Sequence, residues 1–267
     1  MLTSLYYDML IRHRYDVASM PLNFLAVEPN STIVLTAVGS PAAIALDYST
    51  DGTTWSSYTI GTTITLANVG DRVFFRGNNS TFCQSTSNFY RFEMAGKIEA
   101  HGNINSLYDA SCTSLIIPNH DYFFAFLFDA CASLVTAPLL PATTLRNRCY
   151  YTMLRGTSIV EPPALPATRG ISYCYQRMFM DCNELRRTPI LPIKTFAYSG
   201  LYYAMFNGCA KLNYVHCALT TWPTTTNATV SWLADVANEG VFYCPESLDT
   251  SIRDANHIPT GWTVVTY

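Results

Sequence analysis

The spacing of apolar residues divides the chain into three parts, of which residues 1–20 are the first. Apolar residues fall on one helix face there, at the i, i+3, i+4, i+7 and i+8 positions Leu2, Leu5, Tyr6, Met9 and Leu10. Pro21 ends the pattern. The spacing predicts an amphipathic helix over residues 1–20. Its apolar stripe either packs on its own domain or forms a docking helix that inserts into a partner or a second copy.

Residues 21–102 alternate between apolar and polar positions, as strands with one buried face do. Six strands are expected, at residues 22–28, 32–38, 43–48, 54–60, 72–76 and 89–94. Asp51 and Gly52 lie between the third and the fourth, and this dipeptide favours a hairpin because glycine accepts positive φ. Short strands at this spacing predict a small β-sandwich.

Residues 103–267 repeat a unit of 25 to 27 residues, which is the strongest signal in the sequence. The positions that keep the phase are Leu134, Ile159, Leu185 and Leu212, then Pro138, Pro163 and Pro189, and then Pro141, Pro166 and Pro192. Each unit is expected to contain one or two helical turns rich in Tyr, Met and Phe, then an extended Leu-x-x-x-Pro stretch, then a turn back. A single unit cannot bury its apolar face, so the units should stack.

Two segments of the repeats resemble a known family. They are Tyr202-Tyr-Ala-Met-Phe-Asn-Gly-Cys-Ala-Lys-Leu212 and Pro138-Leu-Leu-Pro-Ala-Thr143. Both are similar to units of the BspA-like leucine-rich repeat proteins, and residues 256–265 resemble that family's terminal cap. The second unit departs from the pattern, with Gly156 and Thr157 in place of the Gly-Cys of the fourth. The resemblance implies a capped leucine-rich-repeat solenoid used in adhesion, surface recognition or phage structure.

The expected fold class is therefore α+β or mainly β. It consists of the helix over residues 1–20, a β-sandwich domain over residues 21–102, and a leucine-rich-repeat-like solenoid with a C-terminal cap over residues 103–267.

Composition narrows the function classes. Charged residues make up only 13% of the chain and its net charge is -3, so no basic surface for nucleic acid is expected. No run of 18 apolar residues exists, which argues against membrane insertion. Residues 1–20 carry Asp8, Arg12 and Asp16 where a signal peptide needs an unbroken apolar core, so no signal peptide is expected.

The nine cysteines include no CxxC pair, which argues against zinc and thioredoxin-like sites. Cys131, Cys182 and Cys209 share one repeat position, and Cys149 and Cys174 share another. If the units stacked as helices, about 8–10 Å apart, these residues would be too distant for a disulfide, which needs Cα atoms within about 4.4–6.8 Å. We expect small buried thiols at these positions. Cys217 and Cys244 lie outside the phase, and whether they form a disulfide stays open.

Candidate catalytic groups are scattered. None of the five histidines lies in a recognised motif, and no phosphate-binding loop or zinc spacing is present. Asp181 and Glu184 have the i, i+3 spacing of two carboxylates on one face, as a glycosidase pair would need. However, Asp181 fills a repeat position held by Ala130 and Gly208 in other units, which favours a structural role. We expect no catalytic residue, no metal and no cofactor.

One cluster of polar residues points to recognition. The strand segments of the later units carry charges, whereas Val135 and Val160 lie at the equivalent places in earlier units. The cluster consists of Glu184, Arg186, Arg187, Lys211 and Asn213, here called the polar strip. It is either a solvated surface or a hypothetical binding strip, since the strand side of a solenoid is where such proteins usually bind.

These features predict a non-catalytic phage virion structural or fibre-type protein that serves assembly and attachment to a host or partner. A bacterial cell-surface adhesin with leucine-rich repeats is the alternative, and a glycan-processing enzyme is a distant third. The expected partners are proteins of an assembly, including further copies of the chain, and a host-surface protein or glycan. The expected location is the virion or an extracellular surface.

Overall fold

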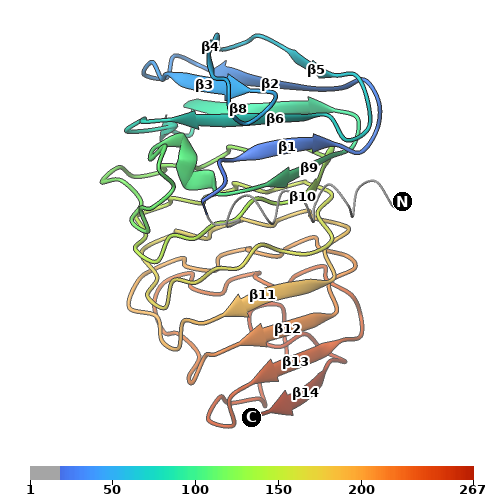
Figure 1. Ribbon diagram of the computed structural model, residues 1–267. Coiled ribbons are helices and arrows are strands. Elements are labelled where there is room, and N and C mark those ends of the chain that lie inside the picture. Colours follow the sequence, from blue (N-terminus) through green and yellow to red (C-terminus); the bar gives the residue numbers. More distant parts are fainter. Residues whose placement is uncertain (1–18) are drawn as a thin grey trace.

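A computed structural model describes residues 19–267, which are mainly β (Figure 1). Within that range the structure contains fourteen strands and one short 3-10 helix, η1 (Ile104–Leu107). The mainly-β alternative of the sequence-based fold class is therefore confirmed. The expected docking helix, with Leu2, Leu5, Tyr6, Met9 and Leu10, lies outside the described residues.

The first region consists of two facing sheets. Its strands are β1 (Asn23–Ala26), β2 (Ser31–Val38), β3 (Leu46–Ser49), β4 (Ser56–Tyr58), β5 (Ile64–Leu66), β6 (Arg72–Gly77), β7 (Cys83–Ser85), β8 (Asn88–Ala95) and β9 (Ile98–His101). One sheet has the order β10-β9-β1-β6-β3-β4, where β10 (Leu134–Thr136) comes from the repeats, and the other has the order β5-β2-β8-β7. All six predicted strands have a counterpart among these.

Aromatic side chains fill the space between the two sheets. Phe24 of β1 and Phe75 of β6 both contact Phe92 of β8, with ring centroids 4.9 and 5.4 Å apart. The contacts follow from the alternation of the strands, because β2 and β8 turn every second apolar side chain toward the other sheet. Edge-to-face contacts of this kind are favourable beyond the apolar area that they bury.

The predicted hairpin at Asp51 and Gly52 is confirmed, because β3 and β4 pair antiparallel on either side of it. Gly52 has a φ of 74°, which a glycine adopts without strain. The Asp51 carboxylate accepts backbone N–H groups of Thr53 and Thr54, both at 2.7 Å. These hydrogen bonds lower the pKa of Asp51.

The later strands form a parallel sheet. It contains β11 (Arg187–Leu191), β12 (Tyr214–Cys217), β13 (Val241–Cys244) and β14 (Thr263–Thr266) in chain order. Figure 1 shows these four strands side by side at the end of the molecule that lies away from the two facing sheets. Residues 256–265, which the sequence associates with a terminal cap, supply part of β14 to this sheet.

The aromatic and Met-rich segment of each unit is a run of turns, so the expected helical turns are wrong. In the second unit, φ is positive at every fourth residue, at Arg148, Thr152 and Gly156. The N–H of Tyr151 donates to the carbonyl of Arg148 three residues back, at 3.1 Å, whereas the N–H of Tyr150 donates to Cys174 of the next unit, at 3.0 Å. Beyond its first turn, a helix would use its amides internally. This run of turns leaves every second amide free to join the next unit.

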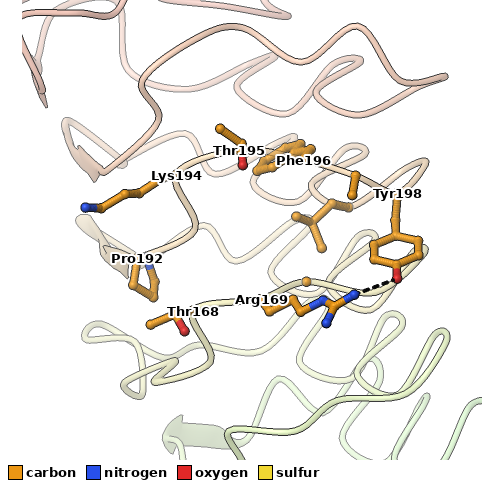
Figure 2. A pocket seen from close by; sticks show the side chains of 10 residues that line it. Thr168, Arg169, Pro192, Lys194, Thr195, Phe196 and Tyr198 are labelled. Carbon is orange, nitrogen blue, oxygen red and sulfur yellow. Dashed lines mark hydrogen bonds between the residues drawn. The ribbon is translucent and has the colours of Figure 1, made fainter.

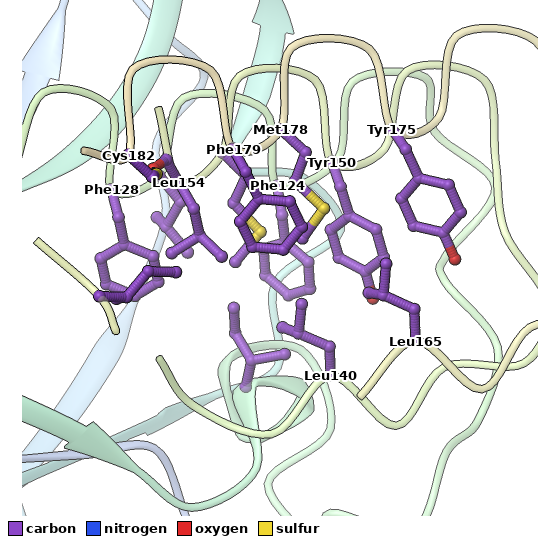
Figure 3. Packing of buried hydrophobic residues seen from close by; sticks show 14 of the residues in the cluster. Phe124, Phe128, Leu140, Tyr150, Leu154, Leu165, Tyr175, Met178, Phe179 and Cys182 are labelled. Atoms are coloured by element: carbon purple, nitrogen blue, oxygen red, sulfur yellow. The ribbon is translucent and has the colours of Figure 1, made fainter. Parts of the chain in front are cut away.

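The turn runs bury pairs of side chains with a period of four residues. In the third unit, the buried residues of this face are Cys174, Tyr175, Met178, Phe179 and Cys182. The expectation that Tyr and Met lie on the inner face is confirmed. Neighbouring units place equivalent rings over one another. Tyr150 and Tyr175, both labelled in Figure 3, have centroids 6.0 Å apart. Those of Phe179 and Phe206 are 5.4 Å apart.

All nine cysteines are free and buried, as expected for the repeat positions. The expected helix-to-helix distance between units is wrong, however. Backbone hydrogen bonds join equivalent residues of adjacent units, so these residues are not separated by a helix diameter. Strands so joined lie about 4.7–4.9 Å apart. Cys217 and Cys244, whose pairing the sequence left open, are also free thiols on adjacent strands β12 and β13.

One hydrophobic core runs through both regions. Phe128, from the first turn run, contacts Phe24 of β1 at 6.1 Å and Phe92 of β8 at 5.6 Å. Strand β10 of the first unit also pairs with β9 in parallel orientation. The repeats therefore begin on the two facing sheets, which cover the apolar surface of the first unit.

Candidate functional site

The polar strip lies where strands β11 and β12 begin. Arg187 is the first residue of β11, and Asn213 directly precedes Tyr214, the first residue of β12. Glu184, Arg186 and Lys211 occupy the bends just before these strands. The structure therefore brings the five predicted residues together at one edge of the parallel sheet.

Ion pairs between units neutralise most of the charged side chains of the polar strip. Lys211 Nζ lies 2.7 Å from Glu184 Oε1, and Arg187 Nε lies 2.7 Å from Glu161 Oε2 of the preceding unit. Arg186 is exposed, and no carboxylate within residues 19–267 pairs with it. Such exposed pairs contribute about 0–1 kcal/mol each. The strip is thus nearly charge-balanced, with Arg186 as its one described cation without a carboxylate partner.

The outward face of the parallel sheet is uncharged beyond Arg187. Ile190, His216, Tyr243 and Val265 lie at paired register positions across the four strands. Ile190 is 60% exposed and Val265 is 42% exposed, which is unusual for residues of this size on a sheet surface. This row, together with Tyr267, is here called the outward row.

Aromatic contacts fix the outward row. The His216 ring lies 4.8 Å from the Tyr243 ring, and the Tyr243 ring lies 4.5 Å from that of Tyr267. The Tyr267 hydroxyl donates to the carbonyl of Cys217 at 3.3 Å. Burial lowers the pKa of His216, so its imidazole is neutral at pH 7. The row therefore presents aromatic and aliphatic groups without charge.

A groove borders the outward row at β11. It has a volume of about 420 Å³ and is lined by Pro162, Leu165, Pro189 and Ile190, with the Glu161–Arg187 ion pair at its rim. A second cavity, of about 310 Å³, lies next to it and shares Pro192 as a wall (Figure 2). Both cavities form where prolines turn the chain of one unit back toward the next.

The structure gives the candidate catalytic groups structural partners. Glu184 pairs with Lys211, and Asp181 occupies a positive-φ position of its turn run, with φ of 61°. His101 and His257 pair with Glu99 and Asp254, at 2.9 and 2.8 Å. Among residues 19–267, no three His, Cys, Asp or Glu side chains are grouped to hold a metal ion. In the same range, no helix is long and apolar enough to cross a membrane.

The outward row is absent from the residues that the sequence predicted for binding. Except for Ile190, its residues lie in segments where the repeat motif fades, after Leu212, so they did not align with earlier units. The alternation of Tyr214, His216 and Tyr243 with buried Val215 and Phe242 was the available signal.

Comparison with known proteins adds nothing to these observations. No family model, no curated protein and no solved structure matches the chain.

Proposed function

We propose that the chain is a non-catalytic attachment protein of a phage virion, of structural or fibre type, whose residues 103–267 form a leucine-rich-repeat-like solenoid behind a small β-sandwich. The hydrogen bonds between successive turn runs and the parallel strands β11–β14 support the solenoid. The resemblance of the repeats to BspA-like proteins supports a role in surface recognition.

The outward row carries the proposal of binding. Stable protein interfaces are enriched in aromatic residues and depleted of charge at their centres. The row has this composition, with Tyr243, Tyr267 and Ile190 exposed or half-buried on a sheet held by backbone hydrogen bonds. The ion pairs of the polar strip lie at its edge, as the polar rim of an interface does. A binding partner would thus meet an apolar centre and the cation Arg186 beside it.

The free thiols favour a virion component over a secreted adhesin. All nine cysteines are unbridged, and Cys217 and Cys244 stay so on neighbouring strands. Proteins that fold in a reducing cytosol keep their thiols, whereas exported proteins commonly form disulfides. Virion proteins assemble inside the host cell before release. Further copies of this chain are the first partners to expect in such an assembly.

A substitution in the outward row tests the proposal. Ile190→Asp places a charge at the β11 end of the row, on its most exposed described residue, and Val69→Asp is the matched control, because Val69 is 63% exposed and lies in the first region. We expect Ile190→Asp to weaken binding to host cells, measured by cosedimentation, by more than about tenfold. Val69→Asp should bind as wild type does.

The polar strip is tested separately. Replacing Arg186, Arg187 and Lys211 together by Ala should weaken attachment by more than about tenfold, or ~1.4 kcal/mol, without unfolding the protein. If both this variant and Ile190→Asp bind host cells as tightly as wild type, attachment does not use this sheet. Labelling of purified particles with an antibody to the chain tests its place in the virion.

A further inference from the structure

The cavity of about 310 Å³ beside the groove has a cationic lining. Two cations line it, Arg169 and Lys194, and none of its lining residues is acidic. Within residues 19–267, no carboxylate lies in salt-bridge distance of either cation. The other two lysines of the chain, Lys97 and Lys211, both pair with a glutamate. The cavity is therefore a local site of uncompensated positive charge.

The repeat changes at this place. Tyr202 is the tenth residue after Pro192, whereas Tyr175 is the ninth residue after Pro166 in the preceding unit. Lys194 follows Pro192 by two residues, where the preceding unit has Thr168 after Pro166. The longer segment carries Phe196 and Tyr198, which form a wall of the cavity. An inserted residue and a new cation thus occur together in the segment that forms the site.

Contacts at both ends of this segment hold it in place. The carbonyl of Lys194 accepts the N–H of Thr220 at 3.1 Å, and the carbonyl of Tyr198 accepts the hydroxyl of Thr225 at 3.1 Å. Phe196 packs edge-on against the buried ring of Tyr202, with centroids 4.8 Å apart. Little ordering of the main chain is then needed when a ligand binds, which favours affinity.

The side chains divide the cavity into a polar and an apolar part. Arg169 donates from Nη2 to the Tyr198 hydroxyl at 3.2 Å, and Figure 2 shows the two side chains meeting at one end while Lys194 lies at the other. This bond uses one of the five guanidinium donors, so Arg169 can also hold a carboxylate. Phe196 and Pro192 offer an apolar wall between the two ends, and Thr195 adds a hydroxyl.

We propose that this cavity binds the carboxylate-bearing sugar of an acidic glycan. A carboxylate satisfies Arg169 or Lys194, sugar hydroxyls suit the threonine and tyrosine hydroxyls, and the apolar face of a pyranose ring packs against Phe196. The volume lies at the lower end of the range for small-ligand sites, about 300–1,000 Å³. The proposal rests on the attachment function, because it names the class of surface ligand, but it uses a surface other than the outward row.

Direct titration of purified protein tests the site. The probes are 3′-sialyllactose and glucuronic acid, with lactose as the uncharged control, and binding is followed by ligand-observed NMR. We expect at least one acidic sugar to bind wild type at least tenfold more tightly than lactose. Binding of sialyllactose alone identifies a sialic acid, and binding of glucuronic acid alone identifies a uronic acid. Equal affinity for lactose, or no binding of either acidic sugar, overturns the proposal.

Matched variants locate the binding. Arg169→Gln and Lys194→Gln should each weaken binding of the acidic sugar at least fivefold, whereas Lys211→Gln removes a paired lysine outside the cavity and should change it less than twofold. Equal losses in all three would mean a diffuse charge effect and overturn the assignment. A third outcome separates this proposal from the proposed function. If wild type binds no acidic sugar while Arg169→Gln and Lys194→Gln still attach to host cells, the cavity is not a sugar site and the proposed attachment function still stands.

Discussion

In the two facing sheets of residues 23–101, neighbouring strands run antiparallel, and sequence-adjacent partners such as β3 and β4 are joined by a hairpin. In the repeats, the strands β11–β14 run parallel, and each partner lies a full unit further along the chain. The first region fixes its register through turns and alternation. The second fixes it through equivalent side chains, such as Tyr150 over Tyr175. Register in the repeats thus depends on core positions that recur, whereas register in the facing sheets depends on turns and alternation.

Alkaline pH should have the largest effect, and most of the groups responsible lie in the repeats, which hold eight of the nine buried cysteines. Burial raises the pKa of Cys131 and Cys149 from 9.0 to about 12. Between pH 9 and pH 12 the unfolded chain loses these protons while the folded chain keeps them. The stability present below pH 9 is therefore lost as pH rises, and we expect unfolding near pH 12.

Guanidinium denaturation at several pH values measures this loss. The midpoint should fall steadily above pH 9, and Cys149→Ala should reduce the dependence on pH relative to wild type because it removes one such group. A midpoint that is the same at pH 8 and pH 11 would contradict the assignment of the thiols as buried in the core.

Phe128→Ala tests whether the two regions unfold as one. Phe128 contacts Phe24 and Phe92 across the boundary, so its truncation should cost about 3–5 kcal/mol. Calorimetry should show one transition for wild type, because one core spans both regions. Two separate transitions in wild type would mean that the facing sheets and the repeats are two independent domains.

Leu185→Ala tests the core of the repeats alone. Leu185 is fully buried at the position that Leu134, Ile159 and Leu212 hold in other units, so we expect a loss of about 2–5 kcal/mol. Arg186, one residue further, is exposed, and Arg186→Ala should stay within about 0.5 kcal/mol. Equal shifts of the melting temperature would reverse our assignment of inside and outside.

Gly208→Ala tests the turn runs. Gly208 has a φ of 77°, and a Cβ there would overlap the Asp181 carboxylate of the preceding unit. The left-handed conformation disfavours alanine by roughly 1–2 kcal/mol, so we expect a loss of at least that size. Ala130 holds the equivalent position with φ of 59° and is exposed, so Ala130→Gly should leave stability unchanged or raise it by up to about 1 kcal/mol. A helical segment would respond in the opposite sense at Ala130, because glycine destabilises a helix.

This difference explains how far the sequence could predict the fold. The alternation in residues 21–102 predicted six strands, and it missed β5, β7 and β9, which have only three or four residues each and no longer alternating stretch around them. In the repeats, the phase of Leu185 and its equivalents predicted which residues are buried. The turn runs were predicted as helical because buried pairs such as Tyr175 and Phe179, four residues apart, suit both a helix and a period of four.

The candidate site was less predictable for a physical reason. The polar strip was recognisable as charge on a strand edge, but whether Lys211 pairs with Glu184 depends on the distance between units, which a sequence does not contain. The cavity beside Arg169 combines side chains of two units, so only the stacking brings Lys194 and Tyr198 near it. Its sequence signal was a departure from the repeat, where Lys194 replaces a threonine.

The smallest effect is expected for the exposed ion pairs, and here the two regions should behave alike. Lys97 pairs with Glu28 in the facing sheets at 3.5 Å, and Lys211 pairs with Glu184 between units at 2.7 Å. Both lysine side chains are more than half exposed, so water screens the attraction, and Lys97→Ala and Lys211→Ala should each change the free energy of unfolding by less than about 1 kcal/mol. Chemical denaturation at low and high salt measures both.

A loss at Lys211 that clearly exceeds the loss at Lys97 and disappears in high salt would show that charge pairs between units help to hold the stack. Small and equal losses would mean that the buried rings and the backbone hydrogen bonds stabilise the stack of units. The lysines and arginines at the starts of the strands would then be free to serve binding.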